Sequence, residues 1–281
     1  MRTSKKQQTE LSSEGGTLVN SVIKALHILE GFTLSQQELT LSQISRQQGL
    51  PKSTALNLIR TLEASGYLLH TSNSQTYRLG YKVMELSYHL RSSMPIIQVA
   101  TPFLEELQIK TEENIYLTSH LDGQVFYLEG LHPSIRIGNY SVAGKRLPMH
   151  CTGCGKAMLA YLPEEELEAV IQRWGLPAIT KNTITSRQRL DKDLELTRSR
   201  GYALDREEET LGVRCIAMPI LDGSGYPAGA ISISGTTISI RDELLNDYAK
   251  MLSRVCNVLA SNASWLPAAQ VRQENLSAGR S

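Results

Sequence analysis

The chain has 281 residues, of which 41% are hydrophobic and 20% charged, and its formal net charge is +1. This length and balance are typical of a folded chain of about two domains and exclude a largely disordered one. No run approaches the roughly 18 consecutive apolar residues of a membrane-spanning helix, and the polar residues 1–16 lack the apolar core of a signal peptide, so we expect a cytoplasmic protein with no membrane partner.

Residues 17–80 have the element order of a winged helix-turn-helix domain, after a disordered segment at 1–16. Three amphipathic helices are predicted: one before Gly31, one at residues 41–48 that ends at Gly49, and one that begins at Pro51 and ends near Gly66. Two short strands, residues 67–70 and 75–79, follow around a polar turn and would form the wing.

Charge differs between the two parts of the chain. Residues 1–82 carry nine Lys/Arg against five Asp/Glu, a net of +4, which leaves twenty against twenty-three, a net of −3, for the remainder. A basic first part suits a nucleic-acid-binding module, although chance variation among surface charges explains the difference equally well.

Beyond residue 80 the pattern first predicts a linker helix at 81–95 and then a domain of alternating strands and helices at 96–266. Helices are expected at residues 96–110, 153–161, 164–173, 190–200 and 241–260. Strands are expected at 115–120, 124–130, 135–139, 202–205, 215–221 and 229–234, with a turn at 222–225 joining the last pair. Residues 267–281 are polar, and we expect a disordered tail there.

Three blocks of sequence resemble the IclR family of bacterial transcription regulators. The first is Gly-Leu-Pro-Lys-Ser-Thr at 49–54 with residues 58–62 and 66–67. The second is residues 147–157, Leu-Pro-Met-His-Cys-Thr-Gly-Cys-Gly-Lys-Ala. The third comprises residues 201–205, 207–208, 212–217 and 231–235. The resemblance spans about residues 19–262 and implies an α+β fold: a winged helix-turn-helix domain, a linker helix and a GAF-like α/β effector-binding domain.

The helix that begins at Pro51 carries the residues expected to contact DNA. If its apolar positions face the core, short polar side chains lie on the opposite side, where they can reach base edges in the major groove. We assign DNA contacts to Lys52, Ser53, Thr54, Asn57 and Arg60, and a backbone contact to Gln43 on the preceding helix. Two alternatives stay open: a merely solvated helix face, and an Arg60 side chain that braces the fold.

The second and third blocks predict an effector pocket. Gly153 and Gly155 flank Cys154 at a helix start, where backbone amides can hold a carboxylate without any Lys or Arg, and Lys156 is expected to point away. The resemblance implies walls at Gly153, Cys154, Asp205, Val213, Cys215, Ser232 and Ser234, and a small hydroxy- or oxo-acid effector. The alternatives are a Gly-Cys-Gly turn that only packs closely, outward-facing serines, and an Asp205 that pairs with an Arg.

The cysteines raise two other possibilities. Cys151 and Cys154 form a Cys-x-x-Cys next to His150, a spacing that zinc or redox sites use, and Cys154 with His150 is compatible with an enzyme that uses a cysteine nucleophile. No second Cys-x-x-Cys completes a four-ligand site, and no third group orients His150. We therefore predict no cofactor, no metal and no catalysis, and reduced thiols rather than disulfides.

One winged helix covers little DNA, so we expect a homodimer or tetramer that binds paired half-sites of an operator. The apolar residues Val83, Leu86, Leu90 and Ile96 of the linker region are the predicted dimer surface.

Overall fold

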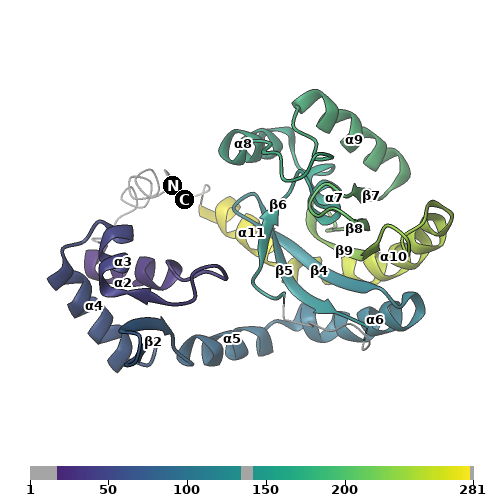
Figure 1. Ribbon diagram of the computed structural model, residues 1–281. Helices are drawn as coiled ribbons and strands as arrows, with labels where there is room; N and C mark the ends of the chain where they lie inside the picture. The colour runs from purple at the N-terminus through teal and green to yellow at the C-terminus, as the bar shows by residue number, and fades with distance from the viewer. Residues whose placement is uncertain (1–17, 134–141, 279–281) are drawn as a thin grey trace. The chain divides into compact units, whose positions relative to one another are not determined.

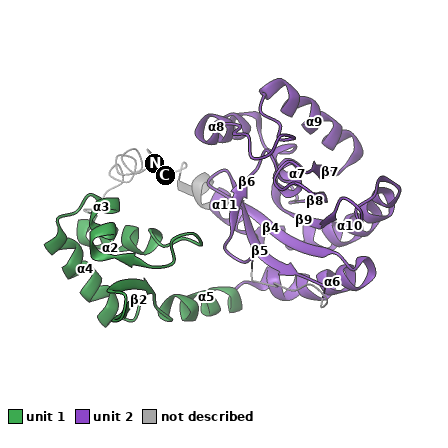
Figure 2. Cartoon of the chain, viewed as in Figure 1, with its two compact units in different colours: residues 1–93 green, residues 94–281 purple. Residues whose placement is uncertain are grey.

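The computed structural model describes residues 18–133 and 142–278 and divides into two compact units, Met1–Ser93 and Met94–Ser281 (Figure 2). Each unit has its own hydrophobic core. No helix in the described ranges is long and apolar enough to cross a membrane.

From residue 18 onward, the first unit contains four helices and a small antiparallel sheet of order β1-β3-β2 (Figure 1). Its elements are α2 (Asn20–Glu30), β1 (Leu39–Thr40), α3 (Leu41–Gln48), α4 (Lys52–Ala64), β2 (Leu68–Thr71), β3 (Thr76–Leu79) and α5 (Lys82–Ser92). The predicted winged helix-turn-helix order is therefore confirmed. The sequence pattern did not predict β1, which pairs with β3 and closes the sheet.

Local chemistry fixes the two helices of the turn. Thr40 and Gln43 form a reciprocal capping box at the start of α3, and Gly49 ends the helix in the left-handed region at φ 61°. Pro51 precedes α4, and its buried positions Ala55, Ile59 and Leu62 form one stripe against the core.

The second unit is built on a six-stranded antiparallel sheet of order β6-β5-β4-β9-β8-β7. The strands are β4 (Asn114–Leu121), β5 (Gln124–Leu131), β6 (Arg146–Pro148), β7 (Ala203–Arg206), β8 (Val213–Leu221) and β9 (Pro227–Thr236). The helices are α6 (Pro95–Thr111), α7 (Gly153–Leu159), α8 (Glu164–Trp174), α9 (Arg187–Arg200), η1 (Asp242–Leu244), α10 (Leu245–Ala260), η2 (Ala263–Trp265) and α11 (Pro267–Ala278).

Helices cover both faces of this sheet, which makes three layers. Figure 1 shows α7, α8 and α9 on one side and α6 and α10 on the other. One hydrophobic cluster joins α6 and α10 to Ile115, Leu117, Ile231 and Ile233, while a second joins α7, α8 and α9 to the opposite face. Successive side chains of β4 and β9 thus belong to different layers, as strand geometry requires.

The structure differs from the sequence predictions at the C-terminal tail and at Ile96, and it does not describe one predicted strand. The tail from Pro267 was expected to be disordered, which is wrong for most of its length: α11 runs over Pro267–Ala278, with Ala268 and Ala269 buried. The amide of Ala268 donates to Ser119 Oγ at 3.1 Å, so a tertiary contact holds the start of this helix. Ile96 is fully buried in the core of the second unit and is unavailable as a dimer surface. The strand expected at 135–139 lies outside the described residues.

Candidate functional site

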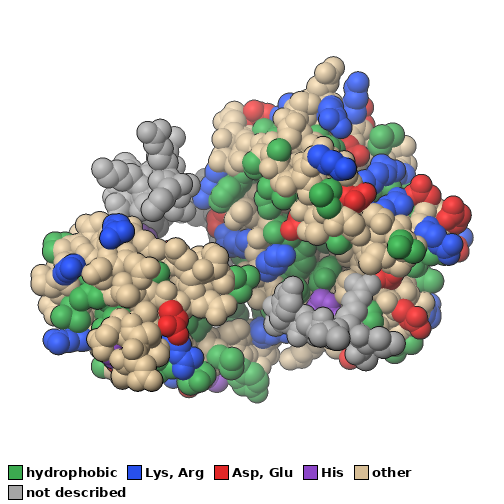
Figure 3. All heavy atoms as spheres, viewed as in Figure 1, with side chains coloured by type: hydrophobic (Ala, Val, Ile, Leu, Met, Phe, Trp, Pro, Cys, Tyr) green, Lys and Arg blue, Asp and Glu red, His purple; other side chains and the backbone are tan. Residues whose placement is uncertain are grey.

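The outer face of α4 presents the predicted polar residues to solvent. Lys52, Ser53, Asn57 and Arg60 are exposed and Thr54 is half-buried. Ser53, Asn57 and Arg60 follow at spacings of four and three, so they lie along one side of the helix. No hydrogen bond or ion pair occupies these side chains within the described part of the chain, and Arg60 is not bonded in a way that braces the fold. On the face that Figure 3 shows, the Lys and Arg side chains of this unit do not gather into one patch.

Gln43 has a second role that the sequence pattern did not reveal. Its Oε1 accepts hydrogen bonds from the Thr40 amide and from Thr40 Oγ1, both at 2.8 Å, as part of the capping box. The wing is also ordered by polar contacts, because Thr76 Oγ1 donates to Glu38 Oε2 at 2.6 Å across the sheet.

In the second unit, strand pairing builds a row of side chains across four strands. Asn114 of β4 faces Ser234 of β9, Ser234 faces Cys215 of β8, and Cys215 faces Asp205 of β7. Tyr116 and Ser232 form the next row on the same face. These rows line a cavity of about 270 Å³ between the sheet and the start of α7.

All seven residues predicted for the pocket line this one cavity: Gly153, Cys154, Asp205, Val213, Cys215, Ser232 and Ser234. Ser232 and Ser234 are buried and face inward, so the outward-facing alternative does not hold. Residues that the sequence analysis missed complete the lining; they are Asn114, Tyr116, Tyr127, Val142, Lys145, Leu147, Thr152, Glu209 and Thr210.

The start of α7 is both closely packed and polar. A Cβ on Gly153 would lie 2.8 Å from Cys215 Sγ, and one on Gly155 would lie 2.2 Å from Met149 O, so both positions require glycine. Thr152 Oγ1 accepts from the Gly155 amide at 3.2 Å and caps the helix. The amides of Gly153 and Cys154 have no helical acceptor and border the cavity.

Lys145 adds a positively charged side chain to the lining of the pocket. The expectation was an anion site without any basic side chain, but Lys145 lines the cavity with an exposed ammonium group, 6.0 Å from the centre of the Tyr127 ring. The loop before β6 supplies this residue, and no motif of the three sequence blocks includes it.

Asp205 is held without an ionic partner of its own. Its Oδ1 accepts from the Glu208 amide at 2.7 Å, and no Arg pairs with it in the part of the chain that the structure describes. Burial raises the pKa of this carboxyl to about 7, because the charged form loses its hydration. At neutral pH, Asp205 is therefore present in both its acid and its ionised form.

Lys156 points away from the cavity, as predicted, into a buried ionic cluster. Its Nζ lies 2.5 Å from Glu208 Oε1 and 3.0 Å from Asp193 Oδ2, and its side chain is 1% exposed. Lys156 thereby joins α7 to α9 and to the loop that follows Asp205.

The thiols around the cavity are free and buried. Burial raises the pKa of Cys154, of Cys215 and of Cys151, the last to about 12. His150 Nε2 lies 3.0 Å from Pro177 O and so is engaged away from the thiols. Protonated thiols are poor nucleophiles and poor metal ligands. Over the described residues, no cluster of three or more His, Cys, Asp or Glu is placed to hold a metal ion.

Comparison with known proteins gives matches to two family models. The IclR helix-turn-helix domain matches residues 21–72, and the bacterial transcriptional regulator IclR C-terminal domain matches residues 88–260. Together these models cover both units that the structure separates.

Individual relatives agree with the models. The HTH-type transcriptional regulator XynR of Escherichia coli is 36% identical over 238 residues, which cover 84% of this chain and 94% of that protein. A transcriptional regulator from a Rhodococcus species has a solved structure that is 28% identical, with a TM-score of 0.75, over 88% of this chain and 99% of its own. An IclR homologue from Microbacterium hydrocarbonoxydans, solved in complex with 4-hydroxybenzoate, shares the fold at 24% identity and a TM-score of 0.71, over 89% and 99%. The chain belongs to the IclR family of bacterial transcriptional regulators and is a DNA-binding regulator of that type.

Proposed function

We propose that this regulator binds a small organic acid in the cavity beside α7 and that the bound acid changes its affinity for operator DNA. The observation that carries the proposal is the convergence of all seven predicted residues on one cavity of about 270 Å³. A regulator of chromosomal DNA would act in the cytoplasm.

The cavity offers groups that suit a carboxylate at one end and a hydroxyl or oxo group at the other. The amides of Gly153 and Cys154 and the ammonium of Lys145 would hold the carboxylate. The hydroxyls of Ser232 and Ser234 would bond a ligand hydroxyl or carbonyl, and Asp205 in its acid form would donate a further hydrogen bond. Val213 and Cys215 would close the remaining walls. The homologue that is complexed with 4-hydroxybenzoate supports the choice of an acid of this size as a probe.

The test is calorimetric titration of glycolate, pyruvate and 4-hydroxybenzoate into the full-length protein. We expect one of these acids to bind, and Ser232→Ala combined with Ser234→Ala to weaken that binding at least about tenfold. Ser261→Ala, an exposed serine outside the cavity, is the control and should leave affinity unchanged. Equal binding by the double variant would remove the serines from the pocket.

We propose that the exposed face of α4 reads the operator. Ser53, Thr54, Asn57 and Arg60 would approach base edges in the major groove, and Lys52 and Gln43 would contact phosphates. DNA selected by the protein from a random pool supplies the specific site. The test variant has all four groove-facing residues replaced by alanine. We expect it to fold like the wild type but to give no footprint on this DNA. Unchanged protection would place the reading face elsewhere.

We propose a homodimer or tetramer on the basis of the exposed apolar surface of α5. This helix buries no residue within its own chain, and Tyr81, Val83, Met84, Leu86, Tyr88 and Leu90 around it are all exposed. An apolar surface of this kind marks an interface. We expect light scattering to show a dimer or a tetramer, and Met84→Glu with Tyr88→Glu to reduce the assembly and weaken operator binding. A wild-type monomer at all micromolar concentrations, free and on DNA, would refute this part of the proposal.

Nothing in the geometry favours catalysis. An enzyme with Cys154 as its nucleophile would need a thiolate, but burial raises the pKa of this thiol. We therefore propose that the cavity only binds its ligand, and recovery of the bound acid chemically unchanged from the protein is the direct test.

A further inference from the structure

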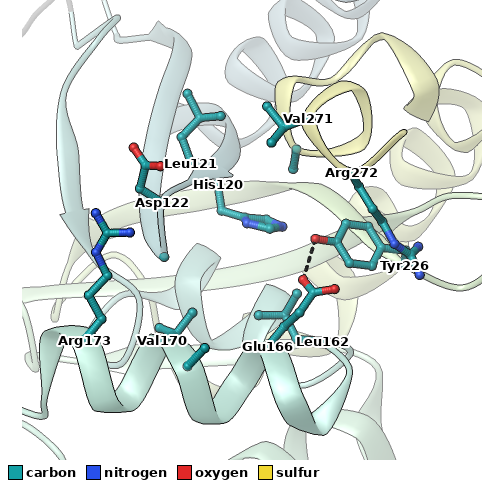
Figure 4. A pocket seen from close by; sticks show the side chains of 13 residues that line it. His120, Leu121, Asp122, Leu162, Glu166, Val170, Arg173, Tyr226, Val271 and Arg272 are labelled. Carbon is teal, nitrogen blue, oxygen red and sulfur yellow. Dashed lines mark hydrogen bonds between the residues drawn. The ribbon is translucent and has the colours of Figure 1, made fainter. Parts of the chain in front are cut away.

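A second cavity in the same unit has no role in the proposed regulation. Its volume is about 570 Å³, and it lies where the end of β4 and Tyr226 of the β8–β9 turn meet α8 and α11 (Figure 4). It shares no lining residue with the pocket beside α7. Along β4, His120 of this cavity follows Tyr116 of the other pocket by four residues, or about 13 Å in a strand.

His120 lines the cavity and carries a buried polar atom without a partner. The side chain is 9% exposed and its ring lies in the middle of the group of side chains that Figure 4 shows. Nε2 of the ring is buried and has no hydrogen-bond partner, while the backbone of Pro227 acts on the ring and partly opposes the fall of its pKa. We assign the ring proton to Nδ1, which leaves Nε2 as an acceptor without a donor. Burial lowers the pKa of His120 to about 4, so the ring is neutral at physiological pH.

The polar groups around His120 include the acceptors Asp122 and Glu166 and the guanidinium donors of Arg173 and Arg272, each at the edge of the cavity. Tyr226 Oη donates its proton to Glu166 Oε2 at 2.8 Å, and the guanidinium of Arg272 lies 4.0 Å from the centre of the Tyr226 ring, which holds the ring in place. Leu162, which precedes α8, and Val170 of α8 point toward the His120 ring, and Val271 faces them from α11 (Figure 4). A molecule in this cavity would thus meet apolar walls and an acceptor that lacks a donor.

We propose that this cavity is a second small-molecule site, which takes a neutral hydroxylated aromatic compound of about the size of an alkylphenol. The hydroxyl donates to His120 Nε2, which satisfies a buried acceptor that water does not reach freely. The ring packs against Leu162, Val170 and Val271. The volume lies within the range of about 300–1,000 Å³ that small-molecule pockets have.

Tryptophan fluorescence of the full-length protein reports on this site directly. The chain has two tryptophans, and Trp174 stands beside the cavity, with Nε1 donating to Asp122 O at 2.7 Å. In a Trp265→Phe background, Trp174 is the only tryptophan. The probes are 4-ethylphenol and 4-ethylanisole, which differ in that the anisole has no hydroxyl proton to donate. We expect saturable quenching by both, with the phenol bound about tenfold more tightly.

Two pairs of variants test the assignment. His120→Phe keeps a ring but removes the acceptor, so the preference for the phenol should disappear while the anisole still binds. Ala169→Phe, at an exposed lining position of α8, should block both probes, whereas Gln172→Phe on the same helix outside the cavity should not.

Three results would overturn the proposal: no saturable quenching at millimolar probe, equal affinity of wild type for phenol and anisole, or binding that survives Ala169→Phe. Loss of 4-ethylphenol binding in the Ser232→Ala and Ser234→Ala variant would place the probe in the pocket beside α7 and would also refute it. Failure here leaves the proposed acid effector untouched, because that ligand is tested with different probes and a different variant.

Discussion

Replacing Asp205 by asparagine should stabilise the protein, and more so at high pH. The carboxyl is 5% exposed and its pKa is raised from 3.8 to about 7, so ionisation is disfavoured in the folded state relative to the unfolded one. Well below pH 3.8 both states hold the proton and the group contributes no penalty. As pH rises from about 4 to 7 the unfolded chain releases its proton first, and folding loses stability throughout that interval.

The size of the effect follows from the two pKa values. Above pH 7 the penalty reaches at most about 4 kcal/mol, and between pH 5 and pH 8.5 it grows by about 2.5 kcal/mol. Asparagine cannot ionise, yet its Oδ1 can still accept from the Glu208 amide, which lies 2.7 Å from that oxygen in the wild type. Asp205→Asn should therefore gain unfolding free energy over the wild type, and the gain should rise with pH.

Urea denaturation at pH 5 and at pH 8.5, with the wild type in parallel, measures this difference. Asp242→Asn is the matched control, because Asp242 is exposed and its pKa is lowered by Arg214. That variant should show no gain at high pH. The stability difference between Asp205→Asn and the wild type could instead be the same at both pH values. That result would show that Asp205 is not held in a desolvated state, and it would also refute the acid form assigned to Asp205 in the pocket.

Three further predictions concern the DNA face and the packing around α7. Lys52→Ala should weaken binding to all DNA sequences and reduce the salt slope by about one, while Asn57→Ala should cost about 1–3 kcal/mol at one base position; salt titrations on specific and random DNA separate the two. Lys156→Met should lower the unfolding free energy by about 3–5 kcal/mol in urea denaturation, because it leaves the buried Glu208 carboxylate and the half-buried Asp193 carboxylate without their cation. Gly155→Ala should lower the melting temperature by several degrees, since its Cβ would lie 2.2 Å from a backbone oxygen, whereas Gly223→Ala, with open space around it, should melt like the wild type.

Much of the fold was predictable because local pattern and tertiary structure agree. The stripe Ala55, Ile59 and Leu62 defines α4, and the polar turn between two short strands defines the wing. Elements that depend on distant partners were missed. Strand β1 has two residues and β6 has three, too few for any alternation to show, and each exists because it pairs with another strand.

The helix α11 was also missed because it depends on a partner that is distant in the sequence. Its sequence has no strong apolar stripe, so periodicity predicts no helix there. What holds it is the bond from the Ala268 amide to Ser119 Oγ, between residues 149 positions apart. A contact of that separation leaves no local signal.

The candidate pocket was half predictable for a similar reason. The seven predicted residues lie in sequence blocks that resemble a family, whereas Asn114, Tyr116 and Tyr127 enter the cavity through strand pairing and Lys145 through a loop. Asn114 is 120 residues from Ser234, its neighbour across the sheet. The burial of Lys156 could not be predicted from the local sequence either, because the carboxylates that surround this lysine are distant in the sequence.

The position of the pocket explains how a small acid could act beyond its own cavity. Ser232 and Ser234 face the cavity, while Ile231 and Ile233, the alternate residues of the same strand, belong to the core that contains Ile96 and Leu104 of α6. Under the proposed function, a ligand that shifts β9 would act on the packing of α6, the helix that follows directly on the first unit. Tight binding alone changes nothing at the DNA, because only a ligand that prefers one packing of α6 over another can alter operator affinity. Strand β9 is the element through which such a preference would act, because one of its faces lines the cavity and the other packs in the core that contains α6.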